Sequence, residues 1–295
     1  MRKILVTATI LIIVAAVVAY AGISVYAANV FTLNERYLPD PEHAALVGSP
    51  YEAVSFRTSD GLLMRGWYFP RGARAVVFVH GKESVRLNDQ QTIDRAKVLL
   101  ANGYSVLAFD LRGGGESEGD RFSLGEYERL DVAAAIAYLE GRGYRAKDVA
   151  LIGHSMGAAT TLETLALRPD VGPVIVDSAF TDADRVVNEG FTHDSGLPSF
   201  FVPGVLLAAR LFGLDHTTIR PIDQVRAHPE RAFFFIHCEN DDFIPVHHAR
   251  DLAAASANAE TQLWIVPGCG HTEAYVTAPA EYDARMLAFL RQQFR

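Results

Sequence analysis

Three residues of this sequence have the side chains that cooperate in nucleophilic catalysis. Ser155 lies in the pentapeptide Gly-His-Ser-Met-Gly, residues 153–157, directly after an apolar run. Asp241 and His271 each follow a later apolar run. A serine hydroxyl attacks a carbonyl carbon efficiently only when a base takes its proton, and an acid orients that base. Together the three residue types predict acyl transfer through a covalent acyl-enzyme.

The residues around Ser155 indicate a sharp turn between a strand and a helix. Gly153 and Gly157 have no Cβ, so the backbone can close tightly there. Such a turn exposes the serine hydroxyl and points the first amides of the helix at whatever the serine attacks. A serine that only caps the helix is the structural alternative. The strand before and the helix after favour the nucleophile.

The base and the acid are expected at the ends of neighbouring strands. His271 ends the segment Val-Pro-Gly-Cys-Gly-His, whose glycines let the loop turn and present the imidazole. Asp241 follows the preceding strand, next to Asp242, so the acid could be either carboxylate. Taken singly, the histidine is an ordinary loop residue and the acids are a solvated loop or helix cap. The order serine, aspartate, histidine at three strand ends favours a triad.

The tetrahedral intermediate also requires hydrogen-bond donors for its oxyanion. The backbone N–H of Met156, the residue after the nucleophile, is the first expected donor. The second is expected in the loop His80-Gly81-Lys82-Glu83, and the N–H of Lys82 is the candidate.

Strands and helices are expected to alternate along the body of the chain. Near-continuous apolar strands between amphipathic helices predict a mostly parallel sheet with helices on both faces. The first two strands form an antiparallel margin around the Asp60-Gly61 turn, and the last two are neighbours. The eight predicted strands are 51–57, 64–69, 73–80, 104–110, 148–152, 174–177, 232–237 and 262–266. The predicted helices are 94–102, 124–140, 155–168, 247–257 and 280–294.

One connection is too long to be a simple loop. Residues 181–230 separate the sixth and seventh strands, and residues 198–214 within them are apolar. We expect a small helical cap above the site that lines an acyl pocket. A second membrane span is disfavoured by Pro198, Pro203 and Arg210. The catalytic body is expected to be one domain, residues 45–295.

The N-terminal segment, residues 1–30, is expected to be a membrane anchor. Residues 4–28 carry no charge and are long enough to cross a bilayer. Arg2 and Lys3 precede them, which predicts a single-pass protein with its catalytic domain outside the cytoplasm. The alternative is a signal peptide, cleaved after Ala21 or Ala27, and a secreted protein.

The charge and motifs of the chain limit the classes of partner and cofactor that it is expected to bind. The chain of 295 residues has a formal net charge of −8 and no basic cluster, which argues against nucleic acid. The triple glycine at residues 113–115 lacks the phosphate-loop pattern. His247 and His248 lack a recognised metal-ligand spacing, and a helix start suits them as capping and surface residues. The expected chemistry needs no metal or organic cofactor.

Five motifs in order resemble the α/β-hydrolase-fold serine hydrolases, in particular the bacterial membrane-anchored branch related to esterases and serine aminopeptidases. They are Val-Phe-Val-His-Gly at 77–81, Phe-Asp-Leu-Arg-Gly-Gly-Gly-Glu-Ser at 109–117, the pentapeptide at 153–157, residues 237–245, and Gly270-His271. The resemblance covers about residues 50–295. It implies Ser155 as nucleophile, His271 as base and Asp241 as acid, and a structural loop at 110–117. The HGGG run of many lipases is absent, and Cys238 stands where the family commonly has glycine.

The two cysteines suggest a cross-link. Cys238 ends one strand, and Cys269 follows the next beside the base. If the strands are adjacent, the two Cα atoms approach within the roughly 4.4–6.8 Å that a disulfide needs. A body outside the cytoplasm permits oxidation. Two buried free thiols are the alternative.

The sequence thus predicts a serine hydrolase that cleaves a carboxylic ester, or a related acyl bond, of a small or lipid-like substrate. A peptidase, aminopeptidase or acyltransferase would have the same triad, because the cap decides the leaving group and acceptor. A non-catalytic binding module that retains the turn is the remaining alternative.

Overall fold

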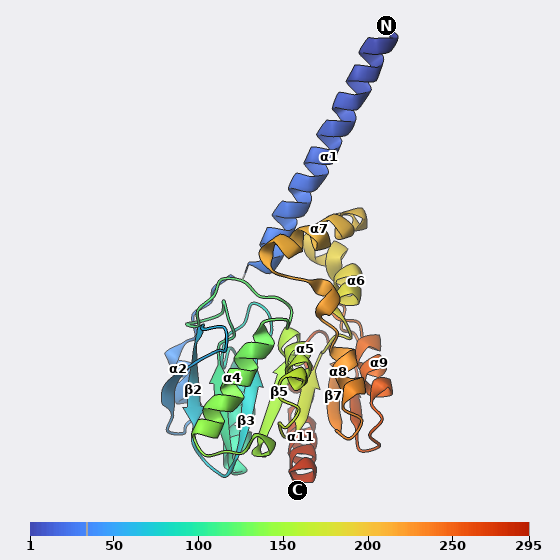
Figure 1. The fold of residues 1–295 in the computed structure, drawn as a ribbon. Coiled ribbons are helices and arrows are strands. Elements are labelled where there is room, and N and C mark those ends of the chain that lie inside the picture. The colour runs from blue at the N-terminus through green and yellow to red at the C-terminus, as the bar shows by residue number, and fades with distance from the viewer. Residues whose placement is uncertain (34, 295) are drawn as a thin grey trace.

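The computed structural model, which describes residues 1–33 and 35–294, contains one eight-stranded sheet in the order β1-β2-β4-β3-β5-β6-β7-β8 (Figure 1). β1 and β2 are antiparallel, β2 is antiparallel to β4, and the remaining pairs are parallel. This confirms the predicted mostly parallel sheet. The strands are β1 Glu52–Arg57, β2 Leu63–Phe69, β3 Arg74–Val79, β4 Tyr104–Phe109, β5 Val149–His154, β6 Val174–Asp177, β7 Phe233–Cys238 and β8 Gln262–Val266.

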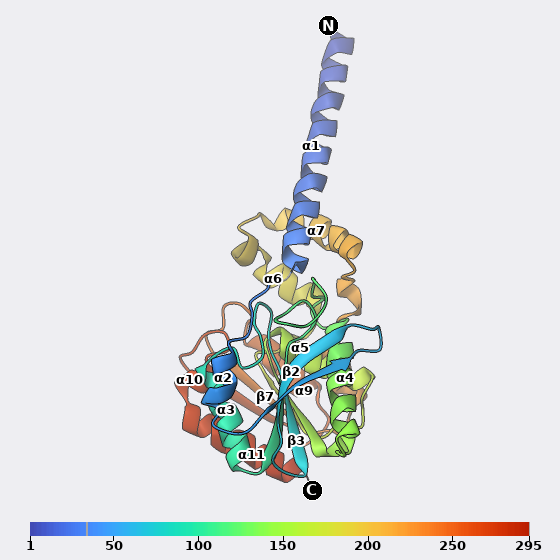
Figure 2. The same cartoon turned by 90° about the vertical axis from the view of Figure 1, so that its left-hand side faces the viewer.

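Helices cover both faces of the sheet, as expected for strands that are apolar on both sides (Figures 1 and 2). One face packs on α2 Pro41–Leu46, α3 Gln90–Ala101, α10 Ala274–Thr277 and α11 Pro279–Gln293. The other packs on α4 Glu128–Gly141, α5 Met156–Glu163, α8 Pro221–Ala227 and α9 His247–Ala255. The short helices α2 and α10 were not predicted.

Two helices begin elsewhere than the sequence predicts. α3 begins four residues earlier because the carboxylate of Asp89 accepts the N–H of Thr92 at 2.8 Å and caps the helix. α4 begins four residues later, at Glu128. The carboxylate of Glu128 accepts the N–H groups of Ser123 and Gly125 at 2.7 and 2.8 Å, and these bonds stabilise the loop before the helix.

The N-terminal helix α1, Arg2–Thr32, projects from the body and is long and apolar enough to cross a membrane (Figure 1). Its C-terminal part does not project freely. Tyr20 stacks on Phe201 with ring centroids 5.1 Å apart, and its hydroxyl donates to the Phe200 carbonyl at 3.0 Å. A Cβ at Gly204 would lie 2.4 Å from the Ser24 hydroxyl, so the backbone of α7 at Gly204 packs directly against side chains of α1.

The cap between β6 and β7 supplies the partner of α1. It contains α6 Ala183–Ser195, α7 Val202–Ala209 and α8, with short 3₁₀ turns Ser199–Phe201 and Arg210–Phe212 on either side of α7. α7 crosses α1 where α1 approaches the body (Figures 1 and 2). Arg121, in the loop after β4, donates to Thr32 at 2.7 Å and to the Asn29 side chain at 2.8 Å. The end of α1 is therefore joined both to the cap and to the body.

Candidate active site

Ser155 occupies the strained turn between β5 and α5. Its backbone has φ 54° and ψ −128°, and its N–H donates to the Asp177 carbonyl at 2.8 Å. A Cβ at Gly153 would lie 2.4 Å from the Gly157 carbonyl oxygen, and one at Gly157 would lie 2.2 Å from the Val79 oxygen. Only glycine fits at both positions, which explains the spacing of the pentapeptide.

The three residues predicted to act together lie in one hydrogen-bonded chain. His271 Nε2 is 2.8 Å from Ser155 Oγ, and His271 Nδ1 is 2.8 Å from Asp241 Oδ2. The other oxygen of Asp241 accepts the N–H groups of Phe243 and Ile244 at 3.1 and 2.8 Å. Asp242 is exposed, so the structure favours Asp241 of the two adjacent acids.

The surroundings of Asp241 keep its carboxylate charged. Burial raises its pKa, but hydrogen bonds with His237 and His271 outweigh burial and leave the pKa below its ordinary value. A charged carboxylate accepts the Nδ1–H of His271. Nε2 then carries the lone pair that can receive the Ser155 proton.

The loop after β3 orients the Lys82 amide. The N–H of Leu111 donates to His80 Nε2 at 2.9 Å, so Nδ1 of His80 carries the proton and donates to the Gly81 carbonyl at 2.8 Å. The Gly81–Lys82 peptide is trans, so its N–H points opposite to that carbonyl. Among residues 1–33 and 35–294, the N–H groups of Lys82 and Met156 donate to no other residue.

The glycine-rich loop after β4 is tied to the loop after β3. The Asp110 carboxylate accepts the N–H of Arg86 and the N–H of Glu116, each at 2.9 Å. The buried Arg86 guanidinium lies 3.4 Å from the same carboxylate. These bonds fit the structural role that the resemblance implies for residues 110–117.

A disulfide joins the loops that carry Asp241 and His271. Cys238 at the end of β7 is bonded to Cys269 after β8, with the two Cα atoms 5.2 Å apart. The Asn240 N–H also donates to the Cys269 carbonyl at 3.1 Å. The pairing of β7 with β8 brings both loops to the same edge of the sheet.

A polar cavity of about 200 Å³ opens beside Ser155 and His271. Its walls come from the loops after β3, β5, β6 and β8 and from the first turns of α3. Among the cap residues whose side chains the structure describes, none of 181–192 or 195–230 lines it, so the prediction that the cap lines the pocket is wrong for this cavity. The apolar cap residues instead pack on α1 and on each other.

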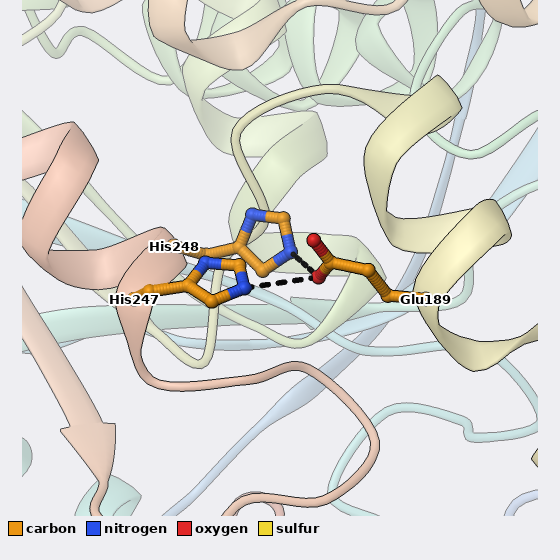
Figure 3. Close-up of side chains that lie close together, drawn as sticks. All are labelled: Glu189, His247 and His248. Atoms are coloured by element: carbon orange, nitrogen blue, oxygen red, sulfur yellow. Dashed lines mark hydrogen bonds and ion pairs between the residues drawn. The ribbon is translucent and has the colours of Figure 1, made fainter.

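Glu189 of the cap lies against His247 and His248 at the start of α9 (Figure 3). The carboxylate oxygen is 3.1 Å from His247 Nε2 and 3.0 Å from His248 Nε2. The Thr181 N–H donates to His248 Nδ1 at 3.1 Å, which leaves the proton on Nε2 and no lone pair there for a metal. Burial lowers the pKa of His248 to about 4, which keeps the ring neutral. The contacts of Glu189 with the two histidines hold the cap against α9.

The geometry agrees with comparison to known proteins. A model of the alpha/beta hydrolase family matches residues 76–285, well over half of the chain. The chain belongs to the alpha/beta hydrolase family. The esterase Pf2001 of Pyrococcus furiosus has the same fold, with a TM-score of 0.75 and 23% identity over 90% of this chain and 99% of that one.

Two relatives of this hydrolase come from Mycobacterium tuberculosis and Rattus norvegicus. The Mycobacterium tuberculosis protein Rv2307c is 29% identical over 255 residues, which are 84% of this chain and 80% of that protein. The lysophosphatidylserine lipase ABHD12 of Rattus norvegicus is 29% identical over 186 residues, which are 60% of this chain and 44% of that protein.

Sequence reasoning missed two residues beside Ser155. Arg95 in α3 and Asp177 at the end of β6 both line the cavity. The end position of Asp177 on a parallel strand was a usable signal, because ligands bind at that edge. Arg95 gave no such signal, since a charged residue within a helix ordinarily lies on its solvated face.

Removing the disulfide is predicted to destabilise the hydrolase. It closes a loop with a sequence separation of 31 residues, for which chain entropy predicts about 3–4 kcal/mol. The double variant Cys238→Ala/Cys269→Ala should unfold roughly 10 °C below wild type in a calorimetric scan. Denatured, unreduced wild type should contain no reactive thiol. Two titratable thiols would contradict the bond.

Proposed function

We propose that this hydrolase is a serine esterase that forms an acyl-enzyme on Ser155. The observation that carries the proposal is the continuous hydrogen-bonded chain from Asp241 through His271 to the Ser155 hydroxyl, with 2.8 Å at both histidine contacts. The strained turn supports it, because non-glycine residues with positive φ concentrate at functional sites.

In the proposed mechanism, Ser155 Oγ attacks the ester carbonyl carbon as its proton moves to His271 Nε2. Asp241 stabilises the imidazolium that forms. The amides of Lys82 and Met156 donate to the developing oxyanion. His271 then gives the proton to the leaving alkoxide. A water molecule, deprotonated by His271, attacks the acyl-enzyme. The acyl–Oγ bond breaks, His271 returns the proton to Ser155 Oγ, and the acid is released.

We propose that α1 is an uncleaved anchor and that the substrate is lipid-like. Cleavage after Ala21 or Ala27 would cut within the part of α1 that packs on the cap, and would remove the contacts of Tyr20. α1 also reaches the site, because Lys82, which lines the cavity, lies with Nζ 5.6 Å from the ring centre of Phe31. The name of the ABHD12 relative, a lysophosphatidylserine lipase, is in keeping with a lipid ester.

The outer stripe of α7, which continues into the flanking 3₁₀ turns, supports contact with the membrane. Phe200, Leu207 and Leu211 are 62, 66 and 74% exposed, and with exposed Pro203 they follow helical spacing. A soluble surface rarely gathers such residues on one stripe. Because α7 crosses α1 where α1 meets the body, this stripe would lie in the membrane interface (Figure 2).

Hydrolysis of p-nitrophenyl esters of increasing acyl length tests the proposed chemistry. Wild type in detergent micelles should turn over at least one ester and react with a fluorophosphonate probe. Ser155→Ala should lose the probe reaction and more than about 10³-fold of kcat, as loss of a triad nucleophile does. A folded wild type that reacts with the probe but cleaves no ester would indicate a peptidase or acyltransferase. One that does neither would indicate a non-catalytic module.

Charges on the outer stripe of α7 should impair lipid hydrolysis selectively. Each exposed leucine buried in the interface contributes about 1.5–3 kcal/mol, and an aspartate there removes that contribution. In vesicles, Leu207→Asp/Leu211→Asp should lower kcat/KM on a lipid ester by about 100-fold or more, with a smaller effect on a water-soluble ester. Leu167→Asp, at an exposed leucine just beyond α5, is the matched control. Equal losses on both esters would contradict contact with the membrane.

A further inference from the structure

Arg95 brings a buried guanidinium to the wall of the active-site cavity. Its side chain lines the same cavity as Ser155 and is only 4% exposed. Nε lies 3.4 Å from the Gln91 carbonyl, and Nη1 donates to the Tyr282 hydroxyl at 3.2 Å. Within the described ranges, Nη2 donates to no residue and the side chain forms no ion pair. Burying such a cation is costly, so donors left free at a cavity wall point to a ligand.

Aromatic rings hold the guanidinium in place. Its central carbon lies 5.8 Å from the ring centre of Phe78, 5.5 Å from that of Tyr275 and 5.6 Å from that of Tyr282. Contacts between a cation and ring faces contribute about 0.5–2 kcal/mol each and offset part of the cost of burial. They also prevent the side chain from turning out to solvent, so its free donors keep a fixed direction.

The acids of the cavity wall do not occupy these donors. Glu83 pairs with Lys82 at 3.2 Å, and Asp89 caps α3 through the Thr92 amide at 2.8 Å. Asp177 lies near enough for the charge of Arg95 to lower its pKa, against the larger effect of burial, which raises it. Asp177 nevertheless forms no ion pair with Arg95 among the described contacts, so it leaves the guanidinium donors free.

The size of the cavity limits what binds there. Its volume of about 200 Å³ is comparable with about seven waters at ~30 Å³ each and is too small for a long acyl chain. The polar wall suits a small polar group, and the planar fork of arginine matches the two oxygens of a carboxylate or phosphate.

We propose that this cavity is a subsite for an anionic group of the substrate, a carboxylate or a phosphate, and that Arg95 binds it. The subsite would select esters with a charged group close to the scissile bond. The proposal rests on the serine-esterase function proposed above and narrows its substrate class.

Matched ester pairs that differ in one anionic group test the subsite. One pair is mono-p-nitrophenyl glutarate and p-nitrophenyl butyrate, and the other is 1-oleoyl lysophosphatidate and 1-oleoylglycerol. The full chain in neutral detergent should favour the anionic member of at least one pair by tenfold or more in kcat/KM. The favoured pair identifies carboxylate or phosphate. Arg95→Gln should lower that preference about 10- to 100-fold, as loss of a charged hydrogen bond does.

Two further variants separate binding from folding. Arg95→Lys keeps the charge without the fork and should retain part of the preference. Lys97→Gln, at a half-exposed position of the same helix, should leave the preference unchanged. Reaction of each variant with the fluorophosphonate probe, and its thermal midpoint, verify the fold.

The outcomes of this experiment are distinct. If wild type cleaves both members of each pair equally, the proposed subsite is refuted. The proposed esterase function is not affected by that result. An Arg95→Gln variant that loses the same fraction of kcat/KM on charged and neutral esters also refutes it, because a structural role would produce that result. Wild type that cleaves no ester and does not react with the probe refutes the proposed function itself.

Discussion

The backbone of Ser155 is the constraint on which the site depends. A serine with φ 54° costs on the order of 1–3 kcal/mol, and the structure around it must hold that conformation. β5 and β6 do so through the Ser155 N–H bond to the Asp177 carbonyl. The close approach of Gly157 to the carbonyl of Val79 places α5 directly beside the end of β3. The turn thereby brings the loop of Lys82, the proposed source of an oxyanion donor, next to the serine.

Two buried histidines, one beside this turn and one at the start of α9, act through fixed protonation states. His80 receives an amide hydrogen on one nitrogen and donates from the other, which orients the peptide between Gly81 and Lys82. His248 is arranged in the same way between Thr181 and Glu189, where it ties the cap to α9. In each ring a backbone N–H selects the tautomer. Burial also lowers the pKa of each, which keeps it neutral.

The fold, and the meeting of Ser155, Asp241 and His271 at one edge of the sheet, could be predicted from sequence because their signals are local. Apolar runs mark strands, the glycines around Ser155 mark a turn, and strand ends share one edge of a parallel sheet. The surface against which the apolar cap packs could not be predicted. Residues 198–214 are apolar on both faces, and sequence does not say whether they cover a pocket, an anchor or a membrane. Their packing on Tyr20 joins residues about 180 positions apart. Arg95 was missed because only tertiary structure reveals that this helical charge is buried.

The proposed membrane anchor and the polar cavity would impose opposite demands on one substrate. The outer stripe of α7 and the end of α1 favour a molecule that resides in a membrane, whereas the wall beside Ser155 is polar and contains Arg95. A purely apolar ester would leave the donors of Arg95 unsatisfied, and a small soluble anion would gain nothing from the apolar stripe. An amphiphile with a long chain and a charged group near its ester satisfies both. With the cap packed on α1, the chain of such a molecule would extend toward the membrane while its charged group enters the cavity, which places the scissile bond at Ser155.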